Sequence, residues 1–583
     1  MAVIVGLVWS CTFPPVNCLP MAWLTPALLL LVTCAPPKRA FQLGFVAGLA
    51  HYFSSLSWLL YIPVSPGNIA GWLALSGYCS IYPALWAAFC WCLFPGDREK
   101  PIHEAIQEIQ FSQRCTWGLA CVLGWVGLEC LRGWVITGFP WNYLGASQLE
   151  FTRLAQLASF TGVLGVTLVV AWMSLGGLLL FWRCKKEKRF QIQWLAELAG
   201  PVALLLIAVI LGSVQLSKPL PKKTSEIRIA LIQPSIPQAV LWDVGNEKAQ
   251  HDRFEHLMDL SDQAMKKDPD LLVWPEASVP PMVFVDPSNP YERITNLLAW
   301  AEAPVPLLGY LNETNVVERI TKLEASIQQK GIWRVWGADT QTNNIPYNSV
   351  VLLAADERFL ANLTHNKRPI YSKQHLVMFG EYVPFGEQFP LLKKLSPIGG
   401  GFGRGKGPVV FDLGTAKTST LICFEDVVPK LARRAATEEV DFLLNLTNDG
   451  WFGNSHQQWQ HALSAAWRAI ETRRPLVRCT NNGITCWVDE YGRFRDHVVR
   501  VPMLDKKMDE NSNSAQKYLE LPVHSPCVRM VTVPIRKGPH AATFYQRTGD
   551  WLPWGSVLAS VGFLTACVWR RKKDSESAAV EDK

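Results

Sequence analysis

The first part of the chain is almost free of charge. Between Met1 and Gly96 the only Lys, Arg, Asp or Glu residues are Lys38 and Arg39. An ordinary soluble protein carries about 25% charged residues, so this stretch is poorly suited to a hydrated surface. A membrane-spanning helix needs roughly 20 mostly apolar residues. The apolar segments therefore predict about eight spans, at 2–17, 21–36, 40–62, 69–94, 115–133, 155–182, 194–215 and 552–569.

The basic residues between these segments predict an orientation in the membrane. If there are eight spans, every basic cluster falls on one side, and the positive-inside rule makes that side cytoplasmic. The clusters are Lys38/Arg39, Arg98/Lys100/Arg114, the Arg183–Arg189 run and Arg570–Lys573. An odd number of spans then precedes the long region after residue 216. We therefore expect that region to lie outside the cytoplasm.

From Glu226 to Arg547 the composition becomes that of a soluble protein. Short β-rich runs alternate with longer helical patterns, which is typical of an α/β domain with helices covering sheet faces. The predicted strands are Arg228–Gln233, Asp270–Trp274, Pro306–Tyr310, Asn348–Ala354, Pro408–Leu413, Ser419–Phe424, Asp441–Thr447 and Leu476–Thr480. The predicted helices are 246–266, 290–303, 429–438 and 456–473. The predicted domains are a helical membrane domain at 1–216, an α/β domain at 224–548, a last span at 551–570 and a polar tail at 571–583.

Several common functions have no support in the sequence. The densest basic runs flank apolar segments, where topology signals are expected, so the net charge of +7 does not indicate a nucleic-acid surface. The soluble region has no CxxC pair for a zinc site or a disulfide framework. Gly400 to Lys406 resembles a phosphate-binding loop, but Gly407 replaces the required Ser or Thr. His456 and His461 lie five positions apart on a predicted helix, which turns them away from a shared face. We expect no metal ion and no cofactor.

Three residues stand at the ends of predicted strands or in tight turns and carry reactive groups. Glu276 ends the run Leu271-Leu-Val-Trp-Pro-Glu276, Lys373 lies in a polar loop, and Cys423 ends the strand that begins near Thr418. Taken singly, each is more easily explained as a surface carboxylate, a solvated lysine or a structural thiol. Together they form a chemical set. A carboxylate can take the proton of a thiol, and a lysine can stabilise the oxyanion that forms when sulfur attacks a carbonyl carbon.

The motifs around these residues resemble one family. The chain is similar to the bacterial apolipoprotein N-acyltransferases, a branch of the nitrilase, or carbon–nitrogen hydrolase, superfamily. The matching motifs are Trp274-Pro-Glu276, Lys373-x-His-Leu-Val-x-Phe-Gly-Glu381, Cys423-Phe-Glu425, Asn448-Asp-Gly-Trp-Phe-Gly453, Thr480-Asn-Asn-Gly-Ile-Thr485 and the membrane loop Gly138-Phe-Pro-Trp141. The resemblance implies an αββα sandwich attached to a membrane bundle of about eight helices.

The resemblance also implies an activity. In this family a phospholipid donates an acyl chain to the catalytic cysteine, and the chain then passes to the α-amino group of the S-diacylglyceryl cysteine that begins a lipoprotein. The implied partners are a phospholipid, a diacylated apolipoprotein and the lipid bilayer, with no nucleic acid. The implied location is the bacterial inner membrane, which the chain crosses several times, with the catalytic domain on the periplasmic side. We also expect a monomer, since nothing in the sequence demands more than one chain.

Residue roles carry over by motif. Glu276 is the implied general base, Lys373 the oxyanion stabiliser and Cys423 the nucleophile. Glu381 and Glu425 match family glutamates that support the cysteine and lysine, and Trp242 and Trp451 match tryptophans near the lipid entrance. Two positions depart from the family pattern: Phe424 stands where many members have Tyr, and Met378 where Pro is common.

Two other functions remain open. A membrane-tethered amidohydrolase would use the same three residues and release free acid from water-soluble amides. A transporter or scaffold would use the domain only for binding. That reading requires the intact Glu276, Lys373 and Cys423 to be coincidental, and the predicted spans hold few of the paired charges that transport tends to need.

Overall fold

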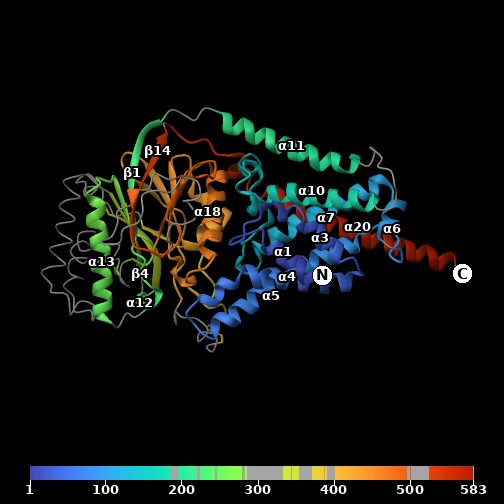
Figure 1. Cartoon of the computed structure of the whole chain (residues 1–583), viewed down its shortest axis with the longest axis horizontal. Coiled ribbons are helices and arrows are strands. Elements are labelled where there is room, and N and C mark those ends of the chain that lie inside the picture. Colours follow the sequence, from blue (N-terminus) through green and yellow to red (C-terminus); the bar gives the residue numbers. More distant parts are fainter. Residues whose placement is uncertain are drawn as a thin grey trace, which may run out of the picture. The chain divides into compact units, whose positions relative to one another are not determined.

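The structure is a computed structural model, and it forms two compact units (Figure 1). It describes residues 1–100, 102–184, 195–218, 223–242, 246–278, 283–284, 333–342, 345–353, 370–386, 388–389, 401–495, 499–500, 524–536 and 538–581. The helical unit comprises Met1–Leu60, Ile69–Lys218 and Thr543–Lys583. The α/β unit comprises Tyr61–Asn68 and Pro219–Ala542. The short Tyr61–Asn68 segment thus belongs with the α/β unit, although it begins inside the predicted span 40–62 and ends where the predicted span 69–94 begins.

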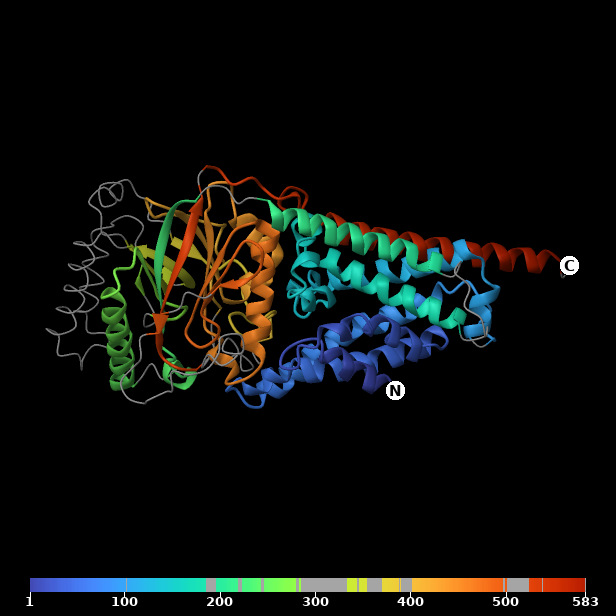
Figure 2. The same ribbon diagram turned by 45° about the horizontal axis from the view of Figure 1, so that its top comes forward.

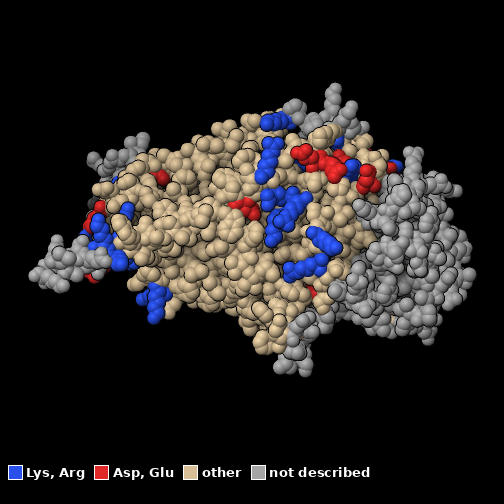
Figure 3. All heavy atoms as spheres, turned by 180° about the vertical axis from the view of Figure 1, so that it is seen from behind, with Lys and Arg blue, Asp and Glu red and all other residues tan. Residues whose placement is uncertain are grey.

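The helical unit contains long and short helices. Its helices are α1 (Ala2–Ser10), α2 (Leu19–Ala22), α3 (Thr25–Val32), α4 (Pro37–Ser55), α5 (Gly67–Cys92), α6 (Ile102–Glu108), α7 (Phe111–Arg132), α8 (Thr152–Ala155), α9 (Ala158–Thr161), α10 (Val163–Cys184), α11 (Ala196–Ser217), α19 (Phe544–Thr548) and α20 (Trp551–Glu581), with 3-10 turns η1 (Ser57–Tyr61), η2 (Val135–Thr137) and η3 (Leu144–Gln148). Among the described residues, four helices are long and apolar enough to cross a membrane, namely α5, α10, α11 and the Trp551–Lys573 part of α20. On the face seen in Figure 3, charged side chains are sparse over this unit.

The first two predicted spans are wrong as single membrane helices. The segments 2–17 and 21–36 contain α1 and α3, which have 9 and 8 residues. At 1.5 Å per residue each is roughly 12–14 Å long, less than half of a hydrocarbon core of about 30 Å. Pro14 and Pro15 follow α1 closely, and proline cannot continue a helix because it lacks the backbone N–H. The predicted total of eight spans is therefore not confirmed.

Two features of α7 explain how the helical unit packs. Gly127 lets α20 approach closely, since a Cβ there would lie 3.2 Å from the backbone nitrogen of Val557. At the other end, the Nε of Arg114 lies 2.7 Å from Oε1 of Glu197 at the start of α11, and Arg183 of α10 reaches the same oxygen at 3.0 Å. The helical unit thus holds paired charges that the apolar sequence pattern did not predict.

The strands of the α/β unit form two sheets within the described residues. The first has the order β13-β14-β1-β2-β4-β5-β6, with β3 beside β4, and the second the order β12-β11-β10-β9-β8-β7. Their bounds are β1 (Lys223–Gln233), β2 (Leu271–Val273), β3 (Val283–Phe284), β4 (Trp333–Thr342), β5 (Ile345–Leu353), β6 (Ile370–Ser372), β7 (Val410–Asp412), β8 (Lys417–Ile422), β9 (Phe442–Thr447), β10 (Leu476–Thr480), β11 (Cys486–Val488), β12 (Phe494–Arg495), β13 (Val499–Arg500) and β14 (Cys527–Arg536). The central strands are parallel in both sheets: β1, β2 and β4 in one, and β8, β9 and β10 in the other.

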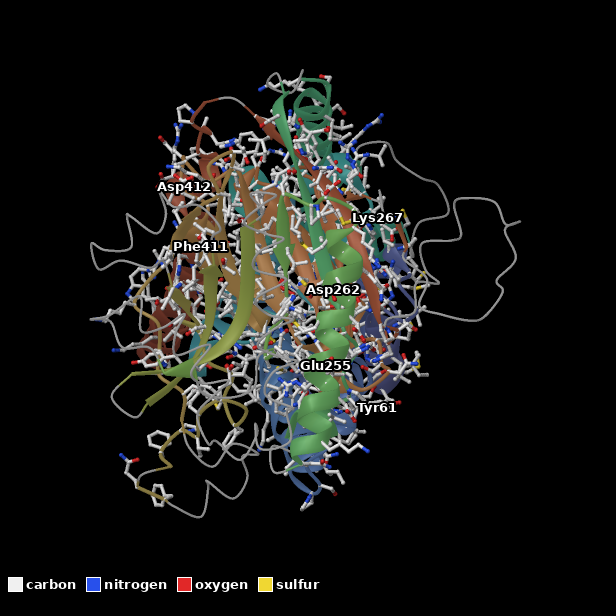
Figure 4. All side chains as sticks on the ribbon, turned by 90° about the vertical axis from the view of Figure 1, so that its left-hand side faces the viewer. Tyr61, Glu255, Asp262, Lys267, Phe411 and Asp412 are labelled. Atoms are coloured by element: carbon white, nitrogen blue, oxygen red, sulfur yellow. The ribbon has the colours of Figure 1, made fainter. Side chains whose placement is uncertain are left out.

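Helices cover the outer faces of the two sheets. They are α12 (Gln238–Trp242), α13 (Glu247–Met265), α17 (Pro429–Ala435) and α18 (Gln457–Thr472), with 3-10 turns η6 (Cys423–Val427) and η7 (Asp449–Phe452). Figure 2 shows α13 and α18 on opposite sides of the strands, and Figure 4 looks onto α13, with Glu255 and Asp262 along it. One apolar core lies between the sheets and contains Phe411 of β7, and a second lies between α13 and the β1–β2 face. The predicted αββα sandwich is confirmed.

Most predicted elements of this unit are found. Six of the eight predicted strands match β1, β2, β5, β7, β8 and β9, and a seventh, Leu476–Thr480, matches β10 with the same bounds. The predicted strand Pro306–Tyr310 and the predicted helix 290–303 lie outside the described residues. The predicted strand Ser419–Phe424 stops earlier, at Ile422, because the chain turns at Cys423 with a φ of +51°.

Candidate active site

The three reactive residues predicted from the sequence follow three different strands. Glu276 follows β2, Lys373 directly follows β6, and Cys423 directly follows β8. The carboxyl ends of strands are where α/β domains build their sites. The Nζ of Lys373 lies 3.5 Å from Oε1 of Glu276, and the charges of both side chains act on the thiol of Cys423. The fold therefore gathers the three residues at one place.

Glu276 is a buried carboxylate held by fixed donors. Its Oε1 accepts a hydrogen bond from the Nδ2 of Asn348 at 2.7 Å, and its Oε2 accepts one from the backbone N–H of Asn448 at 2.9 Å. Burial raises its pKa above the ordinary value, the ammonium of Lys373 opposes this, and the carboxylate of Glu381 adds to it. A carboxylate with a raised pKa is a stronger proton acceptor, which suits a general base.

Lys373 is buried between two carboxylates. Its Nζ donates to Oε1 of Glu381 at 2.8 Å, and Glu276 lies on its other side. Burial alone would lower the pKa of this ammonium, but the charges of Glu381 and Glu276 outweigh that effect and raise it well above the usual range. The backbone N–H of Lys373 donates to the carbonyl oxygen of Asn348, and its own carbonyl accepts from Gly405. Lys373 is thus a permanently charged group in a fixed position.

Asn348 of β5 completes this group, and no motif in the sequence marks it as a site residue. Its Nδ2 donates both to Oε1 of Glu276 and, at 3.1 Å, to Oε1 of Glu381. Two donors, the amide of Asn348 and the ammonium of Lys373, therefore stand between the same two carboxylate oxygens. Both donors oppose the rise that burial imposes on the pKa of Glu276.

Cys423 occupies a strained turn. It has a φ of +51°, a left-handed conformation that is costly for a residue with a side chain, and such strain often marks functional positions. The Nδ2 of Asn445 donates to its carbonyl oxygen at 3.1 Å. Burial raises the pKa of the thiol well above the usual value, the charge of Glu276 adds to this, and Lys373 opposes it. The thiol therefore stays protonated at neutral pH and needs a base before it can attack.

Glu425 links the loop that carries Lys373 to the turn that carries Cys423. Its carboxylate accepts from the backbone nitrogens of Gln374 and His375 at 2.6 and 2.9 Å, from the hydroxyl of Tyr371 at 2.6 Å and from the backbone nitrogen of Ile422 at 2.8 Å. Burial raises its pKa, and these donors oppose the rise. Glu425 thus fixes two parts of the site relative to one another.

The structure describes the side chains of two of the three aromatic residues predicted near the site, Phe424 and Trp451. Phe424 is half-buried and stacks on the ring of His375, with ring centroids 5.9 Å apart. Burial lowers the pKa of His375 to about 4, so that ring is neutral. Trp451 lies in η7, three residues after Asn448, and is half-buried. The side chain of Trp242, at the end of α12, lies outside the described part of the chain.

Large apolar side chains are exposed on the segment that carries Glu381. Phe379 is 37% exposed, Phe385 69% and Phe389 63%. The backbone of Glu381 itself is tied down, because its N–H donates to the carbonyl of Val377 and its carbonyl accepts from Phe402. Exposed apolar side chains clustered beside a site commonly mark contact with an apolar ligand or a membrane.

Comparison with known proteins identifies the class to which this site belongs. Residues 228–502 match the family model for carbon-nitrogen hydrolases, and residues 5–176 match the model for the apolipoprotein N-acyltransferase N-terminal domain. The α/β unit is therefore a carbon–nitrogen hydrolase domain, and the chain that carries it is a membrane protein with apolar helices.

Similarity over the whole chain gives the family. The apolipoprotein N-acyltransferase of Geobacter metallireducens is 30% identical over 98% of this chain and 95% of its own length. Those of Vibrio parahaemolyticus and Rickettsia prowazekii are 29% and 28% identical, each over 85% of this chain and 88% of their own lengths. The chain belongs to the apolipoprotein N-acyltransferase family.

Proposed function

We propose that this protein transfers a fatty acyl chain from a phospholipid, through a thioester on Cys423, to the α-amino group of the S-diacylglyceryl cysteine at the start of a lipoprotein. The observation that carries the proposal is the meeting of Glu276, Lys373 and Cys423 in a carbon–nitrogen hydrolase domain that is joined to apolar helices. The same chemistry in a soluble amidohydrolase would have no use for such helices.

In the first half of the proposed reaction, Glu276 accepts the thiol proton as the sulfur of Cys423 attacks the ester carbonyl carbon of the phospholipid. A C–S bond forms, and the carbonyl oxygen becomes an oxyanion that the ammonium of Lys373 stabilises. When the intermediate collapses, the ester C–O bond breaks and the leaving alcohol oxygen takes the proton from Glu276. The products are a thioester on Cys423 and a lysophospholipid.

In the second half, the α-amine of the lipoprotein attacks the thioester carbon and gives a proton to Glu276. Lys373 again stabilises the oxyanion. The C–S bond then breaks, the sulfur regains a proton from Glu276, and the product is an amide on the lipoprotein. A buried base and ammonium suit this step, because water would compete with the amine for the thioester.

The remaining predicted residues are proposed to support these steps. Glu381 holds the ammonium of Lys373, and Glu425 holds the turn of Cys423 against the loop of Lys373. Trp242, Trp451 and Phe424 are proposed to line the lipid entrance. The exposed Phe379, Phe385 and Phe389 favour an acyl chain over a water-soluble amide. The proposed location is the inner membrane, with a monomeric chain and the α/β unit on the periplasmic side.

Intact-mass spectrometry of the purified full-length protein after incubation with phospholipid vesicles tests this proposal. We expect a hydroxylamine-sensitive acyl adduct on the unmodified protein, and its discharge when a diacylated lipopeptide is added. A Cys423→Ala variant is expected to carry no adduct. A Cys527→Ala variant, which changes another half-buried thiol of the α/β unit, controls for acylation of the wrong cysteine.

The outcome also separates the competing functions. A folded protein that forms no adduct with phospholipid, yet releases free acid from water-soluble amides, would contradict the proposal and favour the tethered amidohydrolase. A folded protein that does neither would favour a binding role.

A further inference from the structure

Four charged side chains form a buried ring behind the nucleophile turn. They come from four elements: Asp426 from η6, Asp449 from η7, His461 from α18 and Arg478 from β10. The Nε2 of His461 lies 2.7 Å from Oδ1 of Asp426, and its Nδ1 lies 2.7 Å from Oδ1 of Asp449. Arg478 pairs with Oδ2 of Asp426 and lies 3.5 Å from Oδ2 of Asp449. Each of the four side chains is at most 2% exposed.

The ring is balanced only if His461 is charged. Both of its ring nitrogens face carboxylate oxygens, and only the protonated imidazole can donate from both. The ring then contains two negative and two positive charges, and buried charges are tolerated when they are paired in this way. Burial alone would lower the pKa of His461, but Asp426 and Asp449 outweigh it and raise the pKa to about 9, with Arg478 opposing them.

Two neutral amides on the helix of His461 also contact the ring. Gln457 and Gln458, at the start of α18, are neutral amides that donate to the side chain and the backbone carbonyl of Asp449. The charges of Asp426, Asp449 and Arg478, which come from three other elements, act on His461.

The ring is connected to both partners of the proposed proton transfer, the thiol of Cys423 and the carboxylate of Glu276. Asp426 lies three residues after Cys423 in the same 3-10 turn, η6. Asp449 directly follows Asn448, whose backbone N–H donates to Oε2 of Glu276 at 2.9 Å. The charge of Asp449 also acts directly on the thiol of Cys423 and raises its pKa. One imidazole thus joins the turn of the nucleophile to the turn that holds the base.

We propose that His461, as an imidazolium, is a positioning residue for this site. It holds the Cys423 turn and the Asn448 turn together and cancels the negative charge that Asp449 places behind the thiol. It touches no reacting atom, and the inference rests on the proposed role of Cys423. Without the imidazolium, the ring would carry one uncompensated negative charge, and the thiolate of Cys423 would be harder to form.

The test measures how fast iodoacetamide alkylates Cys423 at pH 8 in the full-length protein in detergent, read by mass spectrometry of the Cys423 peptide. Iodoacetamide reacts with the thiolate, so the rate falls about tenfold for each unit by which the thiol pKa rises. We expect His461→Gln to slow alkylation by about tenfold. His456→Gln, at the N-cap of the same helix, controls for general disturbance of α18 and is expected to react at the unmodified rate.

A double variant distinguishes charge balance from simple damage. In His461→Gln combined with Asp449→Asn, the remaining Asp426 and Arg478 are neutral as a pair, so we expect alkylation to recover most of the lost rate. Thermal unfolding of each variant establishes that it is folded, and His461→Asn replaces His461→Gln if the latter is not. An unchanged rate in folded His461→Gln, or no recovery in the double variant, would overturn the proposal.

The outcome is independent of the acyl-transfer proposal. Alkylation needs no phospholipid, so a protein whose Cys423 is alkylated normally but never acylated would contradict the proposed function alone. A protein that is acylated but whose alkylation rate ignores His461 would contradict only the present inference.

Discussion

At the scale of single residues, the site depends on two buried carboxylates that share the same two hydrogen-bond donors. Glu276 and Glu381 both face Lys373, and Asn348 donates to both of them from the other side. Each donor contacts both carboxylates. A change at any of the four side chains therefore alters the proton affinity of Glu276, and the direction of the change follows from charge.

The pH dependence of acylation follows from this arrangement. Glu276 accepts a proton, so it must be ionised, and its pKa is raised above the ordinary value mainly by burial. Activity is therefore present above that pKa and is lost as the pH falls through it. Glu381→Gln removes a like charge and is expected to move this acid limb to lower pH, whereas Asn348→Leu removes a donor and is expected to move it to higher pH.

The rate of Cys423 acylation, measured between about pH 4 and pH 8, checks both shifts, since this range begins near the ordinary carboxyl pKa and extends above it. Lys373 remains protonated over this range, because its pKa is raised. Shifts of the two variants in the same direction would contradict the assignment of Glu276 as the base.

Lys373→Met tests the oxyanion role at the same scale. Methionine fills similar space but carries no charge, so we expect acylation of Cys423 to slow by about 100-fold or more, the usual effect of removing an oxyanion donor. Lys417→Met is the matched control, because Lys417 is more than a third exposed and pairs with Glu439 on the surface. Equal rates in the two variants, with both proteins folded, would exclude Lys373 from the reaction.

The sequence revealed some of these residues and not others for a physical reason. Glu276 and Cys423 stand where apolar runs end, and the resemblance to known motifs gave Lys373 and Glu381. Asn348 is 72 positions from Glu276, and nothing near Asn348 in the chain marks it. The spacing of His461 and His456 argues only against a shared metal ion, whereas the contacts of His461 come from Asp426 and Asp449 on other elements. Roles that arise from contacts between distant segments require the folded structure.

At the scale of elements, two loops depend on one carboxylate. Strands β6 and β8 belong to different sheets, and Glu425 accepts backbone hydrogen bonds from the loop after β6 and from Ile422 at the end of β8. Lys373 lies at the start of the first loop and Cys423 at the start of the second. The spacing between ammonium and thiol thus depends on a residue that reacts with nothing.

Glu425→Gln is expected to lower both stability and activity. The amide nitrogen of glutamine would face a backbone donor, leaving at least one buried N–H without an acceptor, which costs about 1–3 kcal/mol. Tyr371→Phe removes a single donor and is expected to cost about 1 kcal/mol. Chemical denaturation of the full-length protein measures both, with the exposed Glu439→Gln as control. A larger loss in Tyr371→Phe than in Glu425→Gln would contradict this account.

Some of the strands were predictable from the sequence, and others were not. β9 and β10 are buried along their whole length and read as short apolar runs with clear ends. β14 was not predicted, although its residues alternate between buried and half-buried. It contains Pro534, which argues against an interior strand. Within the described residues, β13 pairs only with Arg529 and Met530, and Pro534 lies outside that pairing. In the helical unit, apolar content predicted the segments of α1 and α3 but not their short lengths.

At the scale of the whole molecule, the α/β unit is inserted between two apolar helices. The chain enters it after α11, which ends at Ser217, and leaves it through α19 to α20, which begins at Trp551. If α11 and α20 both cross the membrane, everything between them lies on one side. Arg183 at the end of α10 and Arg570–Lys573 in the last part of α20 then lie on the other side, which the positive-inside rule assigns to the cytoplasm.

Labelling with a membrane-impermeant maleimide tests this orientation. Asp412→Cys places a thiol on the α/β unit where the native side chain is 63% exposed. Glu108→Cys places one between α5 and α7, where the native side chain is 58% exposed. Both are made in a Cys34→Ser background, because Cys34 is an exposed thiol of the helical unit. In spheroplasts we expect the Cys at 412 to label directly and the Cys at 108 to label only after the membrane is permeabilised. The reverse pattern would place the α/β unit in the cytoplasm and would contradict the proposed periplasmic location.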